Sequence, residues 1–190
     1  MRGLFVTGTD TGVGKTVVSA VLATSRGWGY WKPIQTGAES DTAEVARLAG
    51  CQVHDEGVRL PEPLSPHLAA SLANTRIALT DLHIPEGNWI VEGAGGVLVP
   101  INERETMLDL MTMLTLPVVV AARTTLGTIN HTLLTLAALR SRELSIEKVV
   151  MVGEPNRENR AAIERYGQVT VDEVPWLDPL TPEAIRAHRL

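Results

Sequence analysis

Residues 8–16, which read Gly-Thr-Asp-Thr-Gly-Val-Gly-Lys-Thr, constrain the fold of this chain more than any other part of its sequence. They follow an apolar run at 4–7, which predicts a strand. They lead into residues 16–25, whose apolar face predicts a helix that ends at Gly27. Glycines let backbone N–H groups turn inward, and a helix N-terminus favours anions. A strand, this loop and a helix in this order indicate a phosphate-binding loop.

The loop departs from the strict pattern G-x-x-x-x-G-K-[ST] at one place. Thr9 stands where the first glycine is usual, and Gly8 lies one residue too early. Lys15 is still placed to reach the β- and γ-phosphates of a nucleotide, and the Thr16 hydroxyl to bind Mg²⁺. An ordinary glycine-rich turn is the alternative, but the order of strand, loop, Gly-Lys-Thr and helix favours phosphate binding.

Apolar runs alternate with helical patterns along the rest of the chain. Strands are expected at residues 29–32, 89–91, 117–122, 148–152 and 169–171, helices at 41–48, 128–142 and 157–166, and helix starts at Ser65-Pro66 and Thr181-Pro182. Strands that are apolar throughout suit a parallel sheet covered on both faces. The prediction is therefore an α/β protein, a P-loop NTPase-type three-layer sandwich with a mainly parallel central sheet flanked by helices. One domain is expected over residues 1–190.

Ligands of such sheets bind at the carboxyl ends of the strands, which here means residues 8–16, 32–41 and 92–96. Glu92 closes the strand expected at 89–91. A carboxylate at that place can hold the Mg²⁺ of a nucleotide. The glycine-rich stretch after it lets backbone approach a ligand closely, which favours a binding role over that of an ordinary strand-end carboxylate.

Two more charged residues fall at the same edge of the sheet. Asp41 stands at the start of a helix, where it is either a second Mg²⁺ ligand or an N-cap, and Glu39 competes for the ligand role. Lys32 ends a strand directly before Pro33. It is either a solvated lysine or a cation that stabilises charge developing during phosphoryl transfer.

Charge and composition exclude several classes of partner. The net charge is −5 without a block of Lys or Arg, which argues against nucleic acid. The histidines are scattered without metal-ligand spacing, so the only metal expected is one that arrives with a nucleotide. Cys51 is the single cysteine, and this favours a reducing, cytoplasmic setting. No apolar run reaches the ~18 residues that span a bilayer, and no signal-peptide pattern is present, so no membrane association is expected.

Six stretches together resemble the dethiobiotin synthetase family of biotin biosynthesis. They are residues 5–16, Lys-Pro-Ile-Gln-Thr-Gly at 32–37, Pro-Leu-Ser-Pro-His at 63–67, Val-Glu-Gly-Ala-Gly-Gly at 91–96, Leu-Gly-Thr-Ile-Asn-His at 126–131 and Val-Pro-Trp-Leu at 174–177. They fall in the family's order over nearly the whole chain. The phosphate loop combined with Glu-Gly-Ala-Gly-Gly is specific for this family and its near relatives.

The resemblance implies an ATP-dependent cyclo-ligase that uses Mg²⁺. One amine of 7,8-diaminononanoate (DAPA) takes up CO₂, which bicarbonate supplies, to form a carbamate. ATP phosphorylates the carbamate to a carbamic–phosphoric anhydride, and the second amine then closes the cyclic urea of dethiobiotin, leaving ADP and phosphate. The family is a homodimer with its site at the subunit interface, so a second copy of this chain is the expected partner.

The resemblance also implies roles for individual residues. Lys15 and Lys32 would be catalytic, and Thr16, Asp41 and Glu92 would hold Mg²⁺. The nucleotide would be bound by Gly12, Val13, Gly14, Lys15, Thr16, Val17, Asp41, Glu92, Gly93, Ala94, Gly95, Gly153, Glu154, Pro175, Trp176 and Leu177. The substrate would be bound by Thr11, Lys32, Thr36, Leu126, Gly127, Thr128 and Asn130. Backbone N–H groups at the start of the Thr128 helix would bind the tail carboxylate of the partner subunit's ligand.

Two departures from the family pattern bear on these expectations. Many members carry Asn-Asp after the fifth strand, and that Asn reads adenine, whereas this chain has Gly153-Glu154. Glycine offers no side-chain donor or acceptor, so weak discrimination between nucleotide bases is expected. The chain is also shorter than typical members, chiefly between Thr36 and Asp41 and near the C-terminus. There, Glu183 falls one residue out of register with a family nucleotide contact.

Other readings of the phosphate loop remain open. A non-catalytic nucleotide-binding regulatory module would be expected to lose catalytic polar groups, yet Lys15, Thr16, Lys32 and Glu92 are all present. Partitioning ATPases of the ParA/MinD type carry a signature lysine where this chain has Asp10. Cobyrinic acid synthases of the amidotransferase type share a similar ATP-dependent domain, but they are normally longer and add a glutaminase domain with a catalytic Cys.

Overall fold

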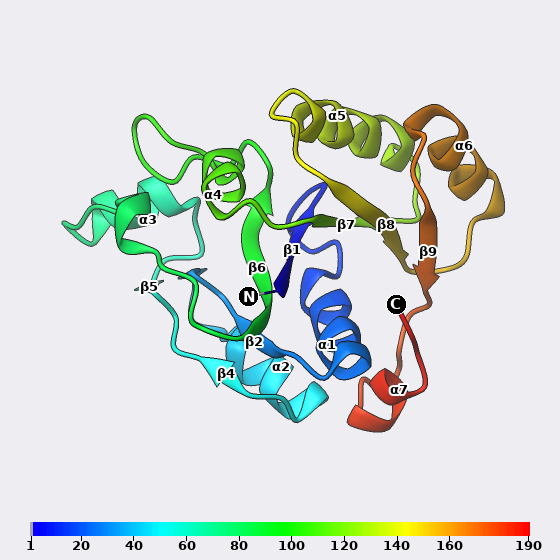
Figure 1. Ribbon diagram of the computed structural model, residues 1–190, viewed down its shortest axis with the longest axis horizontal. Coiled ribbons are helices and arrows are strands. Elements are labelled where there is room, and N and C mark those ends of the chain that lie inside the picture. The colour runs from blue at the N-terminus through cyan, green and yellow to red at the C-terminus, as the bar shows by residue number, and fades with distance from the viewer. Residues whose placement is uncertain (1) are drawn as a thin grey trace.

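Seven parallel strands form the central sheet of the structure, a computed structural model that describes residues 2–190 (Figure 1). In spatial order they are β4 (Val53–His54), β2 (Gly29–Trp31), β6 (Asn88–Gly96), β1 (Arg2–Gly8), β7 (Val118–Arg123), β8 (Ile146–Val152) and β9 (Val171–Val174). Every neighbouring pair is parallel. A separate parallel pair, β3 (Ile34–Thr36) and β5 (Val58–Leu60), follows β2 in the chain. The expected parallel α/β sheet is confirmed.

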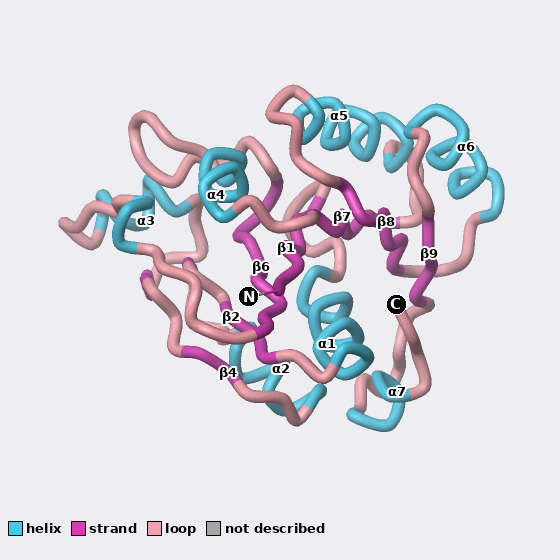
Figure 2. Tube along the Cα trace, in the orientation of Figure 1, coloured by secondary structure: helices cyan, strands magenta, loops and turns pink. Residues whose placement is uncertain are grey.

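Helices cover both faces of this sheet (Figures 1 and 2). One layer holds α1 (Lys15–Arg26), α2 (Asp41–Ala49) and α7 (Pro182–Arg186), and the other holds α4 (Met107–Leu114), α5 (Thr128–Arg140) and α6 (Arg157–Gly167). The short α3 (Pro66–Leu72) packs on β3 and β5. Each helical layer has its own apolar core against the sheet, and the expected three-layer sandwich is confirmed.

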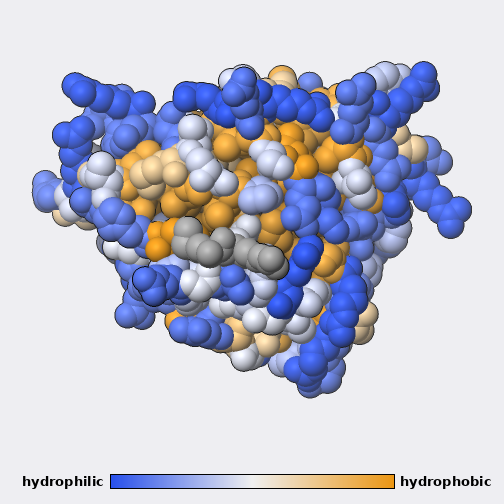
Figure 3. Space-filling model, in the orientation of Figure 1, coloured by the Kyte–Doolittle hydropathy of each residue, from blue (hydrophilic) through white to orange (hydrophobic). Residues whose placement is uncertain are grey.

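Strand alternation divides the apolar side chains between these two cores. Phe5 and Val91 belong to the core under α4 and α5, whereas their neighbours Val6 and Ile90 belong to the core under α1. All four side chains are fully buried. Successive residues of a strand point to opposite faces, so a strand covered on both faces is apolar at every position. In Figure 3 hydrophobic residues gather in the middle of the face, between α4, β7 and α5, inside a hydrophilic rim.

The ends of several elements differ from the sequence-based expectation. Glu92 does not close its strand, because β6 continues to Gly96 while pairing with β1. The final strand is Val171–Val174 rather than 169–171, because Val171 to Val174 are the residues that align with β8. Helix α5 ends at Arg140, two residues earlier than expected, in a turn that returns the chain to β8.

Local signals mark other boundaries correctly. Gly27 and Gly50 end α1 and α2 in the left-handed conformation, at φ 65° and 61°. Pro66 occupies the first turn of α3, where its missing N–H costs nothing. No helix within residues 2–190 is long and apolar enough to cross a membrane.

Candidate active site

The phosphate loop connects β1 to α1, and two of its glycines hold left-handed backbone conformations. Gly12 has φ 70° and Gly14 has φ 90°. A Cβ on Gly14 would lie 2.8 Å from Cγ1 of Val152 on β8, whereas one on Gly12 would meet nothing within 4 Å. The Lys15 ammonium donates to the Asp10 carbonyl at 3.0 Å and so lies folded back over the loop. The loop therefore has the curvature that turns backbone N–H groups toward an anion.

Arg123, at the end of β7, braces this loop. Its Nη2 lies 2.5 Å from Oδ2 of Asp10, and Oδ1 of Asp10 accepts the Thr11 N–H at 2.7 Å. Asp10 thus links the loop to a neighbouring strand through an exposed ion pair. The sequence alone does not indicate this role of Arg123, because a lone Arg at a strand end carries no local signal of its partner.

Glu92 is the centre of a buried polar cluster beneath the loop. Its side chain is fully buried, and all of its partners are side chains from other elements. Oε1 lies 2.9 Å from Lys32 Nζ and 3.4 Å from Thr16 Oγ1. Oε2 accepts hydrogen bonds from the hydroxyls of Ser19 at 2.7 Å and Tyr30 at 3.1 Å. Elements α1, β2 and β6 thus meet at one carboxylate.

Lys32 joins Glu92 to Asp41. Its ammonium lies 2.6 Å from Oδ2 of Asp41 and 2.9 Å from Oε1 of Glu92, and it also donates to the Gly93 carbonyl at 3.3 Å. The side chain is only 3% exposed, which excludes the solvated-lysine interpretation. The alternative that sequence left open, a cation held at the ligand edge of the sheet, is the one that the geometry supports.

Asp41 is the first residue of α2, and its neighbour Ser40 is the N-cap, with a side chain that accepts from the Ala43 N–H at 3.2 Å. The Asp41 carboxylate is therefore free of capping. Its Oδ1 lies 3.0 Å from Thr16 Oγ1. The Asp41 N–H donates to Oε1 of Gln35 at 3.2 Å, so Gln35, which the sequence did not point to, holds the start of α2 at the site.

Burial and charge act in opposite directions on these groups. Burial alone would lower the pKa of Lys32, but Glu92 and Asp41 outweigh it and hold that pKa above its ordinary value. Burial lowers the pKa of Lys15, although Glu92 opposes the shift. Burial would raise the pKa of Asp41, but Lys32 and Thr16 hold it below its ordinary value. Burial and the charge of Glu92 raise the pKa of Tyr30 well above its ordinary value, so its hydroxyl stays protonated.

A cavity of about 720 Å³ opens above this cluster. The predicted site residues that line it are Thr11, Gly12, Gly14, Lys15, Thr16, Lys32, Thr36, Asp41, Glu92, Ala94, Gly95 and Trp176. Glu39, the competitor of Asp41, also lines it, but within the described residues no hydrogen bond or ion pair joins it to Lys32 or Glu92. Val13 and Val17 pack into the apolar core behind the loop. Gly93 is buried in β6.

The predicted base-binding residues lie at the ends of β8 and β9. Gly153 follows β8 with φ 135°, and a Cβ there would lie 2.7 Å from Thr124 Oγ1 and 3.5 Å from Trp176 Nε1. Trp176 is 64% exposed at the edge of the large cavity. Glu154 is exposed, Pro175 is half-buried, and Leu177 packs against the core that α1 shares with the sheet. Of these five residues, Trp176 is the one that lines the large cavity.

The predicted substrate-tail residues lie apart from the large cavity, at the start of α5. Leu126 is fully exposed, Gly127 is the N-cap at φ 93°, and Asn130 is exposed. Thr128 is buried and donates its hydroxyl to the Arg123 carbonyl at 2.6 Å. The family resemblance implies that this segment contacts the partner subunit's ligand, and within one chain it does not line the large cavity.

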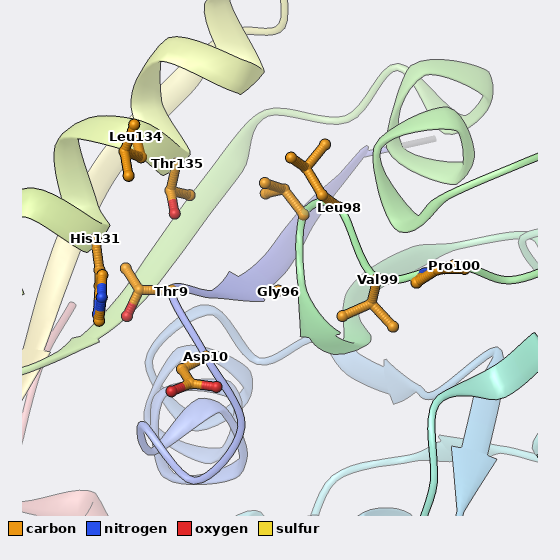
Figure 4. A pocket seen from close by; sticks show the side chains of 10 residues that line it. Thr9, Asp10, Gly96, Leu98, Val99, Pro100, His131, Leu134 and Thr135 are labelled. Carbon is orange, nitrogen blue, oxygen red and sulfur yellow. The ribbon is translucent and has the colours of Figure 1, made fainter. Parts of the chain in front are cut away.

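A second, mostly apolar cavity of about 390 Å³ lies between the phosphate loop, residues 96–100 and α5 (Figure 4). Leu134 and Thr135 of α5 face it from one side and Leu98 from the other, with Thr9 and Asp10 of the loop nearby. Leu98 and Leu134 are each more than 60% exposed. A wide apolar surface thus adjoins the phosphate loop.

The donor set beneath the loop suits Mg²⁺ only together with a nucleotide. Within residues 2–190 no group of three or more His, Cys, Asp or Glu side chains can hold a metal ion. Two carboxylates and a hydroxyl, from Asp41, Glu92 and Thr16, do converge. Mg²⁺ is usually bound by one or two carboxylates plus substrate phosphates, so these oxygens fit an ion that arrives with ATP.

The fold and this site define a P-loop nucleotide-binding protein. Solved structures share the fold at low sequence identity. A ParA family ATPase from Chlorobium tepidum superposes with a TM-score of 0.56 at 11% identity, over 97% of this chain and 87% of that one. A putative plasmid partition protein from Borrelia burgdorferi, bound to AMPPNP, superposes with a TM-score of 0.59 at 13% identity, over 100% and 90%. At such identity the likeness concerns the fold alone.

The chain belongs to the ATP-dependent dethiobiotin synthetase family. A family model described as an AAA domain matches residues 2–184. The ATP-dependent dethiobiotin synthetase of Paramagnetospirillum magneticum is 56% identical, over 90% of this chain and 86% of that protein. The one from Sphingopyxis alaskensis is 46% identical, over 98% and 94%. The biotin biosynthesis bifunctional protein BioCD of Bordetella avium is 50% identical over 97% of this chain, which spans 42% of that longer protein.

Proposed function

We propose that this chain is an enzyme that makes dethiobiotin from DAPA, CO₂ and ATP, releasing ADP and phosphate. The observation that carries the proposal is the buried Lys32, bound to Asp41 and Glu92 directly beneath a phosphate loop. Family membership supplies the substrate class, since the relatives that this chain matches over most of their length are named as ATP-dependent dethiobiotin synthetases.

The proposed reaction proceeds in three steps. A DAPA amine attacks CO₂ and loses a proton, which gives a carbamate. A carbamate oxygen attacks the γ-phosphorus of ATP, the bond to the β–γ bridging oxygen breaks, and ADP leaves. The second amine attacks the carbonyl carbon of the carbamic–phosphoric anhydride, loses its proton, and expels phosphate as the cyclic urea closes.

The residues of this chain would contribute position and charge to those steps. The Thr11–Thr16 loop would bind the phosphates through its N–H groups, and Lys15 would leave the Asp10 carbonyl to contact them. A phosphate would stabilise the charged form of Lys15, which burial disfavours. Lys32 would stabilise the carbamate and the transferring phosphoryl group. Thr36, across the cavity, would contact the diamine.

We propose Thr16, Asp41 and Glu92 as the residues that hold Mg²⁺ with the nucleotide. When bound, Mg²⁺ would neutralise phosphate charge as ADP leaves. Lys32 lies between Asp41 and Glu92, so its ammonium would share these two carboxylates with the ion.

A homodimer with a shared site is proposed from the family and from the apolar surface beside the loop. Leu126 is 101% exposed, and Leu98 and Leu134 are 64% and 62% exposed. A second copy seated there would bring the N-terminus of its own α5 to this chain's cavity, where N–H groups suit a tail carboxylate. A cytoplasmic setting is proposed from the single Cys51.

Weak base discrimination is proposed from the end of β8. Gly153 has no side-chain amide, and the exposed Trp176 at the cavity edge would offer an indole on which any base can stack. When CTP or GTP is added together with ATP, the enzyme should therefore also consume the added nucleotide. The measurement is dethiobiotin formed from mixed nucleotides. ATP preferred by about a hundredfold would contradict it, because the site would then discriminate between bases without the side-chain amide.

The direct test is to incubate the protein with DAPA, bicarbonate and MgATP and to detect dethiobiotin by mass spectrometry. Product that requires all four components is the expected result. A folded protein that binds nucleotide but forms no dethiobiotin would favour the regulatory-module alternative, which the intact set of Lys15, Thr16, Lys32 and Glu92 disfavours.

A further inference from the structure

Two buried hydroxyls donate hydrogen bonds to one carboxylate oxygen of Glu92, Oε2, and the proposed reaction steps use neither hydroxyl. Ser19 Oγ donates to Oε2 at 2.7 Å and Tyr30 OH donates at 3.1 Å. The side chains of Ser19, Tyr30 and Glu92 are all 0% exposed. No water competes for these bonds, so each hydroxyl has an orientation set by Glu92, and Glu92 an orientation set by the hydroxyls.

The two hydroxyl donors lie on two different elements next to Glu92. Tyr30 lies on β2, which pairs with β6 through Tyr30 and Ile90, and Ser19 lies on α1, which packs over β6. A carboxylate oxygen accepts about two hydrogen bonds, so Ser19 and Tyr30 use the capacity of Oε2. The remaining oxygen, Oε1, therefore faces Thr16 and Lys32 at the floor of the cavity.

We propose that Tyr30 and Ser19 are positioning residues that hold Oε1 of Glu92 toward the metal–nucleotide complex. The inference rests on the proposed role of Glu92 as a Mg²⁺ ligand. Neutral hydroxyls suit this task, because they orient the carboxylate without adding a positive charge that would repel the ion. Hydrogen-bond partners of ligating carboxylates commonly act in this way, and their loss typically costs about 10- to 100-fold in metal affinity.

The test measures metal binding apart from activity. Mn²⁺ serves as the probe, in the presence of ADP, and free Mn²⁺ is measured by electron paramagnetic resonance. Tyr30→Phe keeps the ring in the core and removes only the donor. We expect about a tenfold weaker Mn²⁺ affinity, at the lower end of the range for such contacts, because Ser19 remains. Tyr166→Phe makes the same chemical change on an exposed ring and should leave the affinity unchanged.

Two further readouts separate positioning from a structural role. The metal concentration that half-saturates turnover should rise in Tyr30→Phe, while KM for DAPA stays as in the parent protein. Ser19→Ala should weaken Mn²⁺ binding in the same direction. Because both hydroxyls act through one oxygen, the double variant should depart from the sum of the two single effects. If the two substitutions instead acted independently through local structural damage, their effects on Mn²⁺ affinity would add.

The outcomes distinguish this inference from the proposed function. If Glu92→Gln weakens Mn²⁺ binding while both Tyr30→Phe and Ser19→Ala bind as tightly as the parent, the positioning role is wrong and the metal role of Glu92 stands. If Glu92→Gln itself binds Mn²⁺ with ADP as the parent does, the assignment of Glu92 fails and the inference falls with it. If Tyr30→Phe does not fold, as its melting curve would show, Ser19→Ala decides the question.

Discussion

Lys32 is the cation that contacts both buried carboxylates of the site. Its ammonium lies within 2.9 Å of both Glu92 and Asp41, and the side chain is almost completely buried. An ionised group in such surroundings is stable only with a partner, because water is not available to solvate it. Lys32 therefore has two separable roles: it neutralises the carboxylates in the free protein, and we propose that it stabilises the reacting groups.

Replacing Lys32 should reveal both roles. Lys32→Ala should lower turnover by about 100- to 1,000-fold, as expected when a donor to developing negative charge is lost. Nucleotide binding should be largely retained, since the loop is intact. The free energy of unfolding should fall by about 3 kcal/mol, because Glu92 is left buried without a cation. Kinetics, calorimetric titration with an ATP analogue and urea denaturation measure the three quantities.

A matched control for Lys32→Ala is Lys148→Ala. Lys148 forms an ion pair with Asp172 at 2.7 Å on the neighbouring strands β8 and β9, away from the site. Partly exposed pairs contribute about 0–1 kcal/mol, so this change should leave turnover and most of the stability intact. Unchanged turnover in Lys32→Ala would remove Lys32 from the mechanism.

The ion pair between Asp41 and Lys32 predicts an acid-sensitive contribution to stability. Lys32 and Thr16 hold the pKa of Asp41 below its ordinary value of 3.8, so Asp41 stabilises the folded state above that value. This contribution is lost as the pH falls through the lowered pKa of the folded state. Urea denaturation should show Asp41→Asn less stable than the parent at pH 7, with the difference shrinking below about pH 4. A constant difference would contradict the pairing.

The chain's local patterns indicate some residues of the proposed site and not others. Lys15, Thr16 and Glu92 lie in motifs whose neighbours carry the signal. Ser19 and Tyr30 escaped prediction, because their role depends on how α1 and β2 pack against β6. A weak signal existed in their spacing: Ser19 lies about one helical turn after Thr16, and Tyr30 lies two residues before Lys32, on the same face of an extended segment.

At the scale of elements, the phosphate loop depends on two glycines for different reasons. Both have positive φ, but only Gly14 is also blocked, by Val152 at 2.8 Å. Gly12→Ala should cost about 1–2 kcal/mol of stability, the ordinary penalty of a left-handed alanine. Gly14→Ala should cost clearly more, because a backbone shift or a displaced β8 is also required.

The measurement is thermal unfolding without nucleotide, which reports the loop's own strain rather than lost binding. Gly12→Ala is the control for Gly14→Ala, since the two substitutions add the same atom to similar backbone conformations. Equal melting temperatures for the two variants would show that Val152 does not obstruct the position.

Elements with strong periodicity or clear end signals were predicted, and short or uniformly apolar ones were not. The sequence does not predict α4, because its Met-Leu-Asp-Leu-Met-Thr-Met-Leu stretch lacks one polar face. Its start was nonetheless encoded, because Thr106 and Asp109 form a reciprocal capping box. The short strands β3 and β5 are not predicted either, since each has only three residues and Pro33 precedes the first.

At the scale of the whole molecule, the exposed leucines beside the phosphate loop predict self-association. Leu134→Asp should convert a homodimer into monomers, because a carboxylate would be buried at the interface without a partner. Light scattering after size exclusion measures the mass. Turnover should fall with the loss of the dimer, since the partner's α5 is proposed to complete the substrate site.

Leu72→Asp is the control for that substitution. Leu72 on α3 is 59% exposed, close to the 62% of Leu134, but it lies outside the cavity shown in Figure 4. It should leave the mass and the turnover unchanged. A dimer that persists in Leu134→Asp, or a monomeric parent protein, would contradict the proposed interface.

The order of strands in the sheet has a consequence for how such a protein changes over evolutionary time. The charged groups proposed for the reaction stand on α1, α2 and β6 and directly after β2, whereas Gly153 and Trp176, which we propose contact the base, follow β8 and β9 on the other side of β1. Mutations that alter the nucleotide base accepted can therefore accumulate at one end of the sheet without touching a single contact of Glu92 or Lys32. Nucleotide specificity and the catalytic reaction can therefore evolve independently of one another.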